Sequence, residues 1–123
     1  MKILFVCVGN SCRSQMAEAI AKKMGHEAFS AGTNPASEVN YNAIKVLKKM
    51  GIDTSKLFPK SIDKFLEESF DMIISMGCGV FCPSIRIDQD WKLEDPVGKK
   101  LKFFEEIAIT IKENIKLFNE IKQ

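Results

Sequence analysis

Several residue types on which common enzyme designs depend are scarce in this sequence of 123 residues. It contains one histidine, His26, and one tyrosine, Tyr41. A cysteine–histidine pair or a serine–histidine–aspartate triad needs a histidine beside its nucleophile. His26 directly follows Gly25, and we expect it to lie on a surface turn. Catalysis that depends on histidine is therefore not predicted.

The sequence also lacks an excess of charge of either sign. Its 18 basic and 16 acidic side chains leave a net charge of +2. Proteins that bind nucleic acids or anionic membranes usually carry a basic patch or stripe. We expect neither partner here, so any affinity for an anion must come from local geometry.

A long hydrophobic run is missing as well. The first apolar stretch, from Ile3 to Val8, is too short for a signal sequence or a membrane span. We therefore expect the reducing cytoplasm, where the four cysteines would not form permanent disulfides. Metal binding or thiol chemistry is the better expectation for them. The length allows one domain, residues 1–123.

Short apolar stretches alternate with segments of helical periodicity. Strands are predicted over 2–8, 27–31 and 71–76, with a weaker fourth within 85–93; helices are predicted over 14–24, 39–50, 61–68 and 101–118. This order is typical of an α/β protein with a small doubly wound, four-stranded parallel sheet and helices on both faces. In such sheets the ligand lies beyond the carboxyl ends of the strands.

The first predicted strand ends in the sequence CVGNSCRS, and a helix begins at once. Backbone N–H groups in such a loop can converge on an anion, and the free N–H groups of the helix start add to them. Gly9 and Asn10 tolerate the backbone angles that a tight loop needs. Arg13 offers a planar fork for two oxygens of a phosphate-like group. An oxyanion site is predicted at Val8, Gly9, Asn10, Ser11, Cys12, Arg13 and Ser14.

Cys7, at the start of this loop, is the predicted nucleophile. A free cysteine has a pKa of about 8.5, and activated ones fall to roughly 3.5–7.5. Lowering the pKa by about three units requires about 4 kcal/mol, whereas a helix dipole contributes about 0.3–2 kcal/mol. Amide hydrogen bonds, the Arg13 charge and the Ser14 hydroxyl must supply the rest. The alternative is a buried structural cysteine in a strand, followed by an ordinary turn.

The run CVGNSCRSQMAEA, from Cys7 to Ala19, resembles the low-molecular-weight protein tyrosine phosphatase superfamily, and most closely its arsenate reductase branch. The tripeptides SAG at 30–32 and GID at 51–53 fall at the expected places. EDPVGK, at 94–99, resembles the aspartate–proline loop of that family. The resemblance implies that Cys7 is the nucleophile, Arg13 the oxyanion clamp and Asp95 the general acid.

Cys78 and Cys82 follow the third predicted strand, whose carboxyl end should lie near the Cys7 loop. The resemblance implies that they resolve an arsenic adduct on Cys7 through a disulfide cascade, with a thioredoxin-like reductant restoring the dithiol. Their interval is shorter than in the reductases to which the resemblance points. A zinc pair and two buried apolar cysteines remain alternatives, and Cys12 is expected to be a loop-packing thiol.

Two other functions remain open on the same scaffold. One is an aryl phosphatase, although Val97 stands where tyrosine phosphatases of the family usually carry an aromatic residue. The other is a non-catalytic oxyanion or redox sensor. We expect arsenate as ligand with phosphate as its mimic, no organic cofactor and a monomer. The resemblance also leaves room for a potassium site at Asn10, Glu18 and Ser30.

Overall fold

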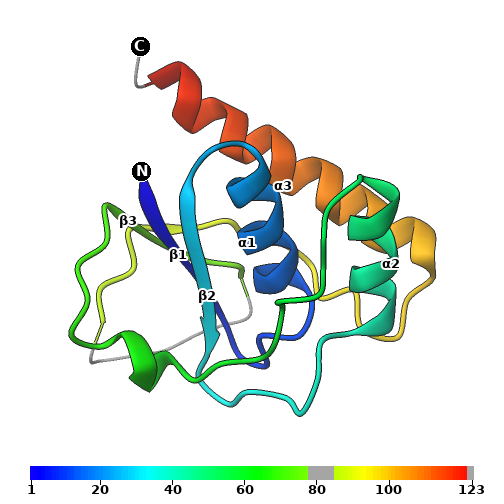
Figure 1. Ribbon diagram of the computed structural model, residues 1–123, viewed down its shortest axis with the longest axis horizontal. Coiled ribbons are helices and arrows are strands. Elements are labelled where there is room, and N and C mark those ends of the chain that lie inside the picture. The colour runs from blue at the N-terminus through cyan, green and yellow to red at the C-terminus, as the bar shows by residue number, and fades with distance from the viewer. Residues whose placement is uncertain (78–84, 122–123) are drawn as a thin grey trace.

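The computed structural model describes residues 1–77 and 85–121. The elements follow one another in the order expected for an α/β protein (Figure 1). They are β1 (Lys2–Cys7), α1 (Arg13–Lys23), β2 (Glu27–Gly32), α2 (Tyr41–Lys49), the 3₁₀ helix η1 (Ile62–Phe65), β3 (Met72–Ser75), β4 (Gln89–Asp90) and α3 (Leu101–Ile121). Within these described ranges no helix has both the length and the apolar character needed to cross a membrane.

The four strands form one parallel sheet in the order β2-β1-β3-β4. Val6 of β1 pairs with Ala31 of β2 and with Ser75 of β3. The predicted four-stranded parallel sheet is confirmed. β4 is reduced to two residues. The Ile73 N–H donates to the Asp88 carboxylate at 2.7 Å, whereas in a longer strand it would donate to a backbone carbonyl.

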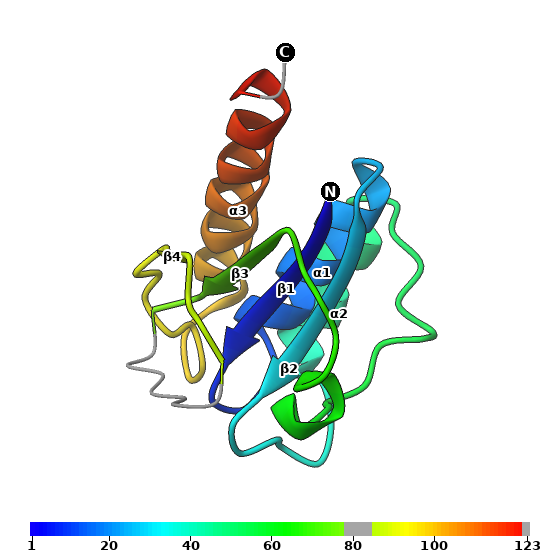
Figure 2. The same cartoon turned by 90° about the vertical axis from the view of Figure 1, so that its left-hand side faces the viewer.

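Side chains of β1 alternate between two cores, as the pleat of a strand requires. Ile3 and Phe5 pack with α1, α2 and α3 on one face, through residues such as Met16, Ile20, Leu47, Phe104 and Ile111. Leu4 and Val6 point to the opposite face and pack against Ile62, Phe65, Phe70 and Ile73. In the part of the chain that the structure describes, all three α-helices therefore lie on one side of the sheet, and the predicted helical cover of the second face is limited to the single turn of η1 (Figure 2).

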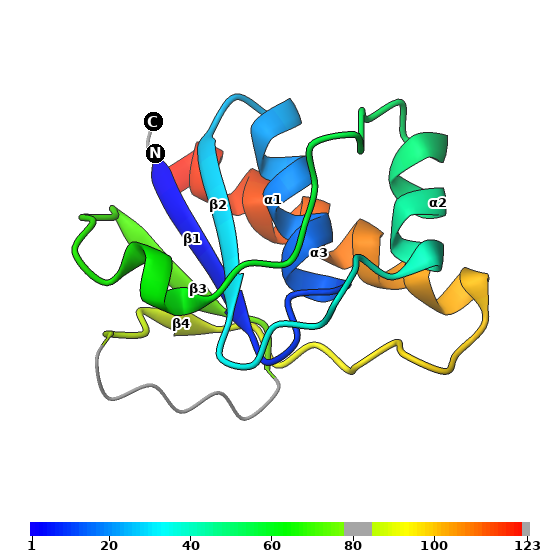
Figure 3. The same ribbon diagram turned by 60° about the horizontal axis from the view of Figure 1, so that its bottom comes forward.

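The helix predicted over 61–68 is thus limited to Ile62–Phe65. Ser61 caps it by accepting the Asp63 N–H at 3.1 Å, but Leu66 to Glu68 are exposed and have no core to cover. The loop after β1 and the segment between β4 and α3 meet at the same end of the sheet (Figure 3). This is the carboxyl end of the strands, where the ligand is expected.

Candidate active site

The loop between β1 and α1 is held from outside by the backbone of segment 33–40. Four loop carbonyl oxygens accept hydrogen bonds from N–H groups of that segment: Cys7 from Thr33 at 3.1 Å, Val8 from Asn34 at 2.9 Å, Gly9 from Ala36 at 2.9 Å and Ser11 from Asn40 at 2.8 Å. In a trans peptide the carbonyl and the following N–H point in opposite directions. Because these carbonyls face outward, the N–H groups that follow them face the centre of the loop.

Two donors meet at the Cys7 sulfur, which lies at the end of β1. The Asn10 backbone N–H donates to Cys7 Sγ at 3.1 Å, and Asn10 reaches this position with a left-handed φ of 49°. Ser14 Oγ lies 2.8 Å from the same sulfur. Asn10 Nδ2 donates to Ser14 Oγ at 2.8 Å, and the serine hydrogen is available to a Cys7 thiolate, which can only accept. This arrangement stabilises a thiolate. Asn10 and Ser14 are fully buried beneath the loop and support the sulfur, and neither lines the pocket itself.

Arg13, the first residue of α1, is buried with 5% of its surface exposed. Its Nη1 donates to the Leu93 carbonyl at 2.8 Å, which anchors the guanidinium from one side. Arg13 Nε has no hydrogen-bond partner, and the only other such buried side-chain atom in the described residues is Gln15 Oε1. Buried donors are normally satisfied, and a bound oxyanion would provide the missing acceptor. No side chain caps α1, so its first N–H groups are also available.

Asp95 lies at the mouth of a pocket of about 310 Å³ at this site. Its side chain is 58% exposed, and its Oδ2 lies 4.0 Å from Arg13 Nη2. The Val97 N–H donates to Asp95 Oδ1 at 3.0 Å and fixes the carboxylate in a tight turn. The pocket is lined by Cys7, Val8, Gly9, Ser11, Cys12, Arg13, Asp95 and Val97. The structure therefore brings together the predicted nucleophile, clamp and acid.

Cys12 also lines this pocket, but it differs from Cys7 in its surroundings. Burial raises the pKa of the Cys12 thiol, and the nearby Asp95 and Cys7 act in the same direction. A hydrogen bond from the Arg13 backbone opposes this effect without reversing it. Cys12 therefore stays protonated near neutral pH, as expected of a loop-packing thiol.

Cys78 and Cys82 lie outside the described residues. The chain leading to them is placed: Met76 follows β3, and its carbonyl accepts the Leu93 N–H at 3.0 Å and the Arg13 Nη1 at 3.5 Å. Gly77 has a φ of +96°, and a Cβ there would lie 2.4 Å from the Lys92 Cα. Glycine is thus required at this close approach, immediately before segment 78–84.

The residues named for a potassium site do lie together behind the loop, but they are already engaged. Ser30 Oγ donates to Glu18 Oε1 at 2.6 Å. The same oxygen lies 3.3 Å from Lys60 Nζ, and Lys22 Nζ lies 2.9 Å from Glu18 Oε2. One carboxylate thus faces two ammonium groups, and Asp63, three residues beyond Lys60, is exposed. This set does not fit an additional monovalent cation.

Two residues of this network were not found by sequence reasoning. Gln15 is fully buried, and its Nε2 donates to the Asn10 backbone carbonyl at 3.0 Å and to the Phe58 carbonyl at 2.8 Å. Gln15 lies inside the motif CVGNSCRSQMAEA, so its place in the motif was a usable signal. Lys60 carried no such signal, because it lies in a stretch without regular structure.

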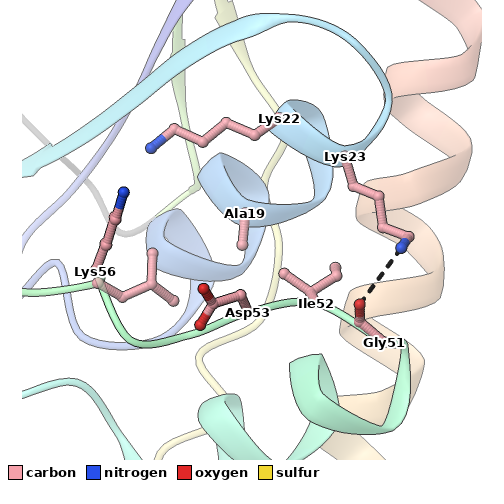
Figure 4. A pocket seen from close by; sticks show the side chains of 8 residues that line it. Ala19, Lys22, Lys23, Gly51, Ile52, Asp53 and Lys56 are labelled. Atoms are coloured by element: carbon pink, nitrogen blue, oxygen red, sulfur yellow. Dashed lines mark hydrogen bonds between the residues drawn. The ribbon is translucent and has the colours of Figure 1, made fainter.

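A second pocket, of about 340 Å³, lies between α1 and the segment that follows α2 (Figure 4). Lys22, Lys23 and Lys56 line it together with Asp53 and apolar residues. Lys23 Nζ bonds the Gly51 carbonyl at 3.4 Å, and Lys22 is paired with Glu18. The lining contains no cysteine, serine or threonine, and His26 is not part of either pocket.

The fold and the Cys7 loop define a class of enzyme that holds a tetrahedral oxyanion against a cysteine sulfur at the end of a parallel sheet. A family model described as low molecular weight phosphotyrosine protein phosphatase matches residues 2–123, and the chain belongs to that family. It is 39% identical over 121 residues to the glutaredoxin arsenate reductase of Synechocystis sp., covering 93% of this chain and 92% of that protein.

Solved structures agree with this assignment. An arsenate reductase in the phosphate-binding state superposes with a TM-score of 0.86 and 38% identity, covering 95% of each chain. The low molecular weight protein tyrosine phosphatase from T. tengcongensis superposes with a TM-score of 0.78 and 30% identity over 98% of each chain. Both activities therefore occur on this fold among proteins similar to the chain.

Proposed function

We propose that this chain is an arsenate reductase that works through a covalent Cys7 adduct and a relay of thiols. The observation that carries the proposal is the position of Met76 beside Arg13: its carbonyl accepts a hydrogen bond from Arg13 Nη1. The chain thus enters segment 78–84, with its two cysteines, beside the oxyanion clamp. A phosphatase has no use for thiols at that point. The relatives that bear the name arsenate reductase add support.

The first half of the cycle uses groups of the described pocket. Arsenate binds to the inward N–H groups of the loop and to Arg13. The Cys7 thiolate attacks the arsenic atom, and one arsenate oxygen leaves. The departing oxygen is an arsenate hydroxyl that already carries one proton, and Asp95, at the mouth of the pocket, supplies the second, so it leaves as water. The product is an arsenic(V) thioester on Cys7.

The second half is an internal thiol–disulfide exchange. The Cys78 thiolate attacks the Cys7 sulfur, the sulfur–arsenic bond breaks, and its electron pair reduces arsenic(V) to arsenic(III), which leaves as arsenite. Cys82 then attacks Cys78, which frees the Cys7 thiolate and leaves a Cys78–Cys82 disulfide. A dithiol reductant of the thioredoxin or glutaredoxin type supplies the two electrons that reopen this disulfide. Such a cycle requires a compartment that keeps thiols reduced, and we place it in the cytoplasm.

Aryl phosphate hydrolysis is the second candidate, because the same pocket would accept a phosphoryl group and form a phosphocysteine. The similarity to the phosphatase from T. tengcongensis favours it. Val97, which is 54% exposed beside Asp95, offers a substrate ring an aliphatic contact instead of an aromatic one. We therefore expect this activity to be the weaker of the two.

The test is arsenate-dependent NADPH consumption, coupled through thioredoxin reductase and thioredoxin or through glutathione and glutaredoxin. Wild type is compared with Cys82→Ser, and Cys7→Ser serves as the inactive control. We expect sustained consumption by wild type and about one turnover or less by Cys82→Ser, because the disulfide can no longer be passed on.

Two results would contradict the proposal. Brisk hydrolysis of an aryl phosphate without arsenate turnover by either coupled system would make the chain a phosphatase. Oxidation of wild type once per molecule, with no further turnover in the presence of reductant, would make it a sensor.

A further inference from the structure

The ammonium group of Lys60 lies inside the molecule, behind the Cys7 loop. The Lys60 side chain is 8% exposed, and its Nζ lies 3.3 Å from Glu18 Oε1. The same Nζ donates to the Phe58 carbonyl at 2.9 Å and lies 4.7 Å from the centre of the Phe58 ring. Carboxylate oxygen, carbonyl oxygen and an aromatic face are all groups that a monovalent cation prefers.

Glu18 is the centre of this cluster. It is 4% exposed, accepts the Ser30 hydroxyl at 2.6 Å and pairs with Lys22 at 2.9 Å. The single negative charge of Glu18 is therefore already more than balanced by the positive charges of Lys22 and Lys60. A potassium ion placed among Asn10, Glu18 and Ser30 would meet a like charge at a distance of a few ångströms, in a region shielded from water.

The backbone of Lys60 connects this cluster to the nucleophile. Its N–H donates to Asn10 Oδ1 at 2.8 Å, and its carbonyl accepts the Gly32 N–H at 2.8 Å. Asn10 Nδ2 is thereby turned toward Ser14, whose hydroxyl donates to the Cys7 sulfur. A change in the position of residue 60 would reach Cys7 through three successive hydrogen bonds.

We propose that the Lys60 ammonium is a built-in cation that orients Asn10 and Ser14, so that Cys7 reactivity in this chain does not depend on potassium. Lys60 is a positioning residue, since it touches neither substrate nor sulfur. The inference rests on the proposed role of Cys7 as nucleophile, but it holds equally for a reductase and a phosphatase. Its test therefore uses Cys7 alkylation, which requires no substrate.

The experiment measures the rate of Cys7 alkylation by iodoacetamide and the melting temperature in potassium and sodium chloride of equal ionic strength. All proteins carry Cys78→Ser and Cys82→Ser, and the site of labelling is read by mass spectrometry. Lys60→Ala removes the ammonium and leaves space. Lys64→Met is the matched control, because exposed Lys64 also lies over the Phe58 ring, 5.4 Å from its centre.

With Lys60 intact, we expect the same rate and melting temperature in both salts, and the same for Lys64→Met. Lys60→Ala should alkylate about fivefold more slowly in sodium, the factor associated with one lost hydrogen bond. Potassium should then restore part of the rate and raise the melting temperature of this variant alone.

Three outcomes would overturn the proposal: potassium stimulation of the protein with Lys60 intact, an unchanged rate in Lys60→Ala, or a lowered rate that potassium does not restore. If Lys60→Ala fails to fold, Lys60→Gln takes its place with the same expectations. A complete failure of Cys7 to alkylate in the parent protein would instead contradict the proposed nucleophile, so the two failures are distinguishable.

Discussion

Asn10 and Ser14 are joined by a hydrogen bond of 2.8 Å from the amide Nδ2 to the hydroxyl Oγ, which itself lies 2.8 Å from the Cys7 sulfur. A thiolate sulfur has no hydrogen to donate, so in the reactive form of Cys7 the serine hydroxyl is the donor. The Asn10 amide occupies one acceptor position of the serine oxygen and leaves its hydrogen for the thiolate.

Ser14→Ala should make the Cys7 thiol less acidic. The hydrogen bond that is lost serves a charged group, and such bonds contribute about 1.5–3 kcal/mol. We expect the pH midpoint of Cys7 alkylation to rise by about one to two units, with kcat/KM at neutral pH falling by about tenfold or more. A pH titration of the alkylation rate measures this, and an unchanged midpoint would show that Ser14 does not support the thiolate.

Asp95→Asn should slow formation of the first covalent adduct, because the amide cannot protonate the leaving oxygen. General acids typically contribute about 10²–10⁴-fold. Single-turnover kinetics over a range of pH should lose the dependence that reflects the carboxyl group. Phosphate should still protect Cys7 from alkylation, because Arg13 and the loop N–H groups remain. Equal rates and equal pH profiles in variant and wild type would remove Asp95 from the reaction.

Cys12 should react much more slowly than Cys7 with iodoacetamide near pH 7. Burial raises the Cys12 pKa above that of an ordinary cysteine in the folded protein. In a protein that also carries Cys78→Ser and Cys82→Ser, we expect a single label, on Cys7, as read by mass spectrometry. Labelling of Cys12 at a comparable rate would mean that burial does not keep its thiol protonated.

The same pKa shift has a consequence for stability at alkaline pH. Below the pKa of an ordinary cysteine, Cys12 is protonated in both the folded and the unfolded state, and its contribution to stability is fully present. As the pH rises from the ordinary cysteine pKa through the raised pKa of the folded state, Cys12 loses its proton first in the unfolded state. The contribution of Cys12 to folding stability is lost over this range. Urea unfolding of wild type and Cys12→Ala across this window should show a smaller alkaline loss in the variant.

Gly32→Ala should damage the loop through the backbone. A Cβ at residue 32 would lie 2.5 Å from the Val8 carbonyl oxygen and 3.0 Å from the Asn10 Cβ. We expect a loss of stability of about 1–3 kcal/mol and slower Cys7 alkylation. Gly25→Ala is the control: its φ of +96° imposes strain, but no atom lies within 4 Å of the added Cβ. That variant should lose stability and keep its alkylation rate.

The sequence was sufficient to predict the Cys7 loop, because there the residues that carry the function also determine the local backbone. The strand that ends at Cys7 and the helix that begins at Arg13 leave little freedom for the loop between them, so its donors could be predicted. The stripe of Ala43, Val46 and Leu47 in α2 indicated a buried face, but an amphipathic pattern does not say which side of a sheet it covers. The placement of all three α-helices on one face required the structure.

Lys60 shows why the rest could not be predicted. It lies 42 positions beyond Glu18 in the chain, and no periodicity or motif connects the two residues. Its burial depends on the path of segment 50–61, which has no regular secondary structure to predict. A lysine in such a stretch would ordinarily be assigned to the solvated surface.

The outer support of the catalytic loop has an evolutionary consequence. Segment 33–40 holds the loop through main-chain N–H groups, while the side chains of Thr33, Asn34 and Ala36 are exposed. Pro35, which has no N–H group, occupies a position between two of these donors. The amino acids at 33, 34 and 36 can therefore vary with little effect on the chemistry, provided that none of these donor positions becomes proline, whereas Val39 is buried and Asn40 caps α2. An insertion or deletion would shift the donors out of step with the carbonyls, so selection here acts on length more than on composition.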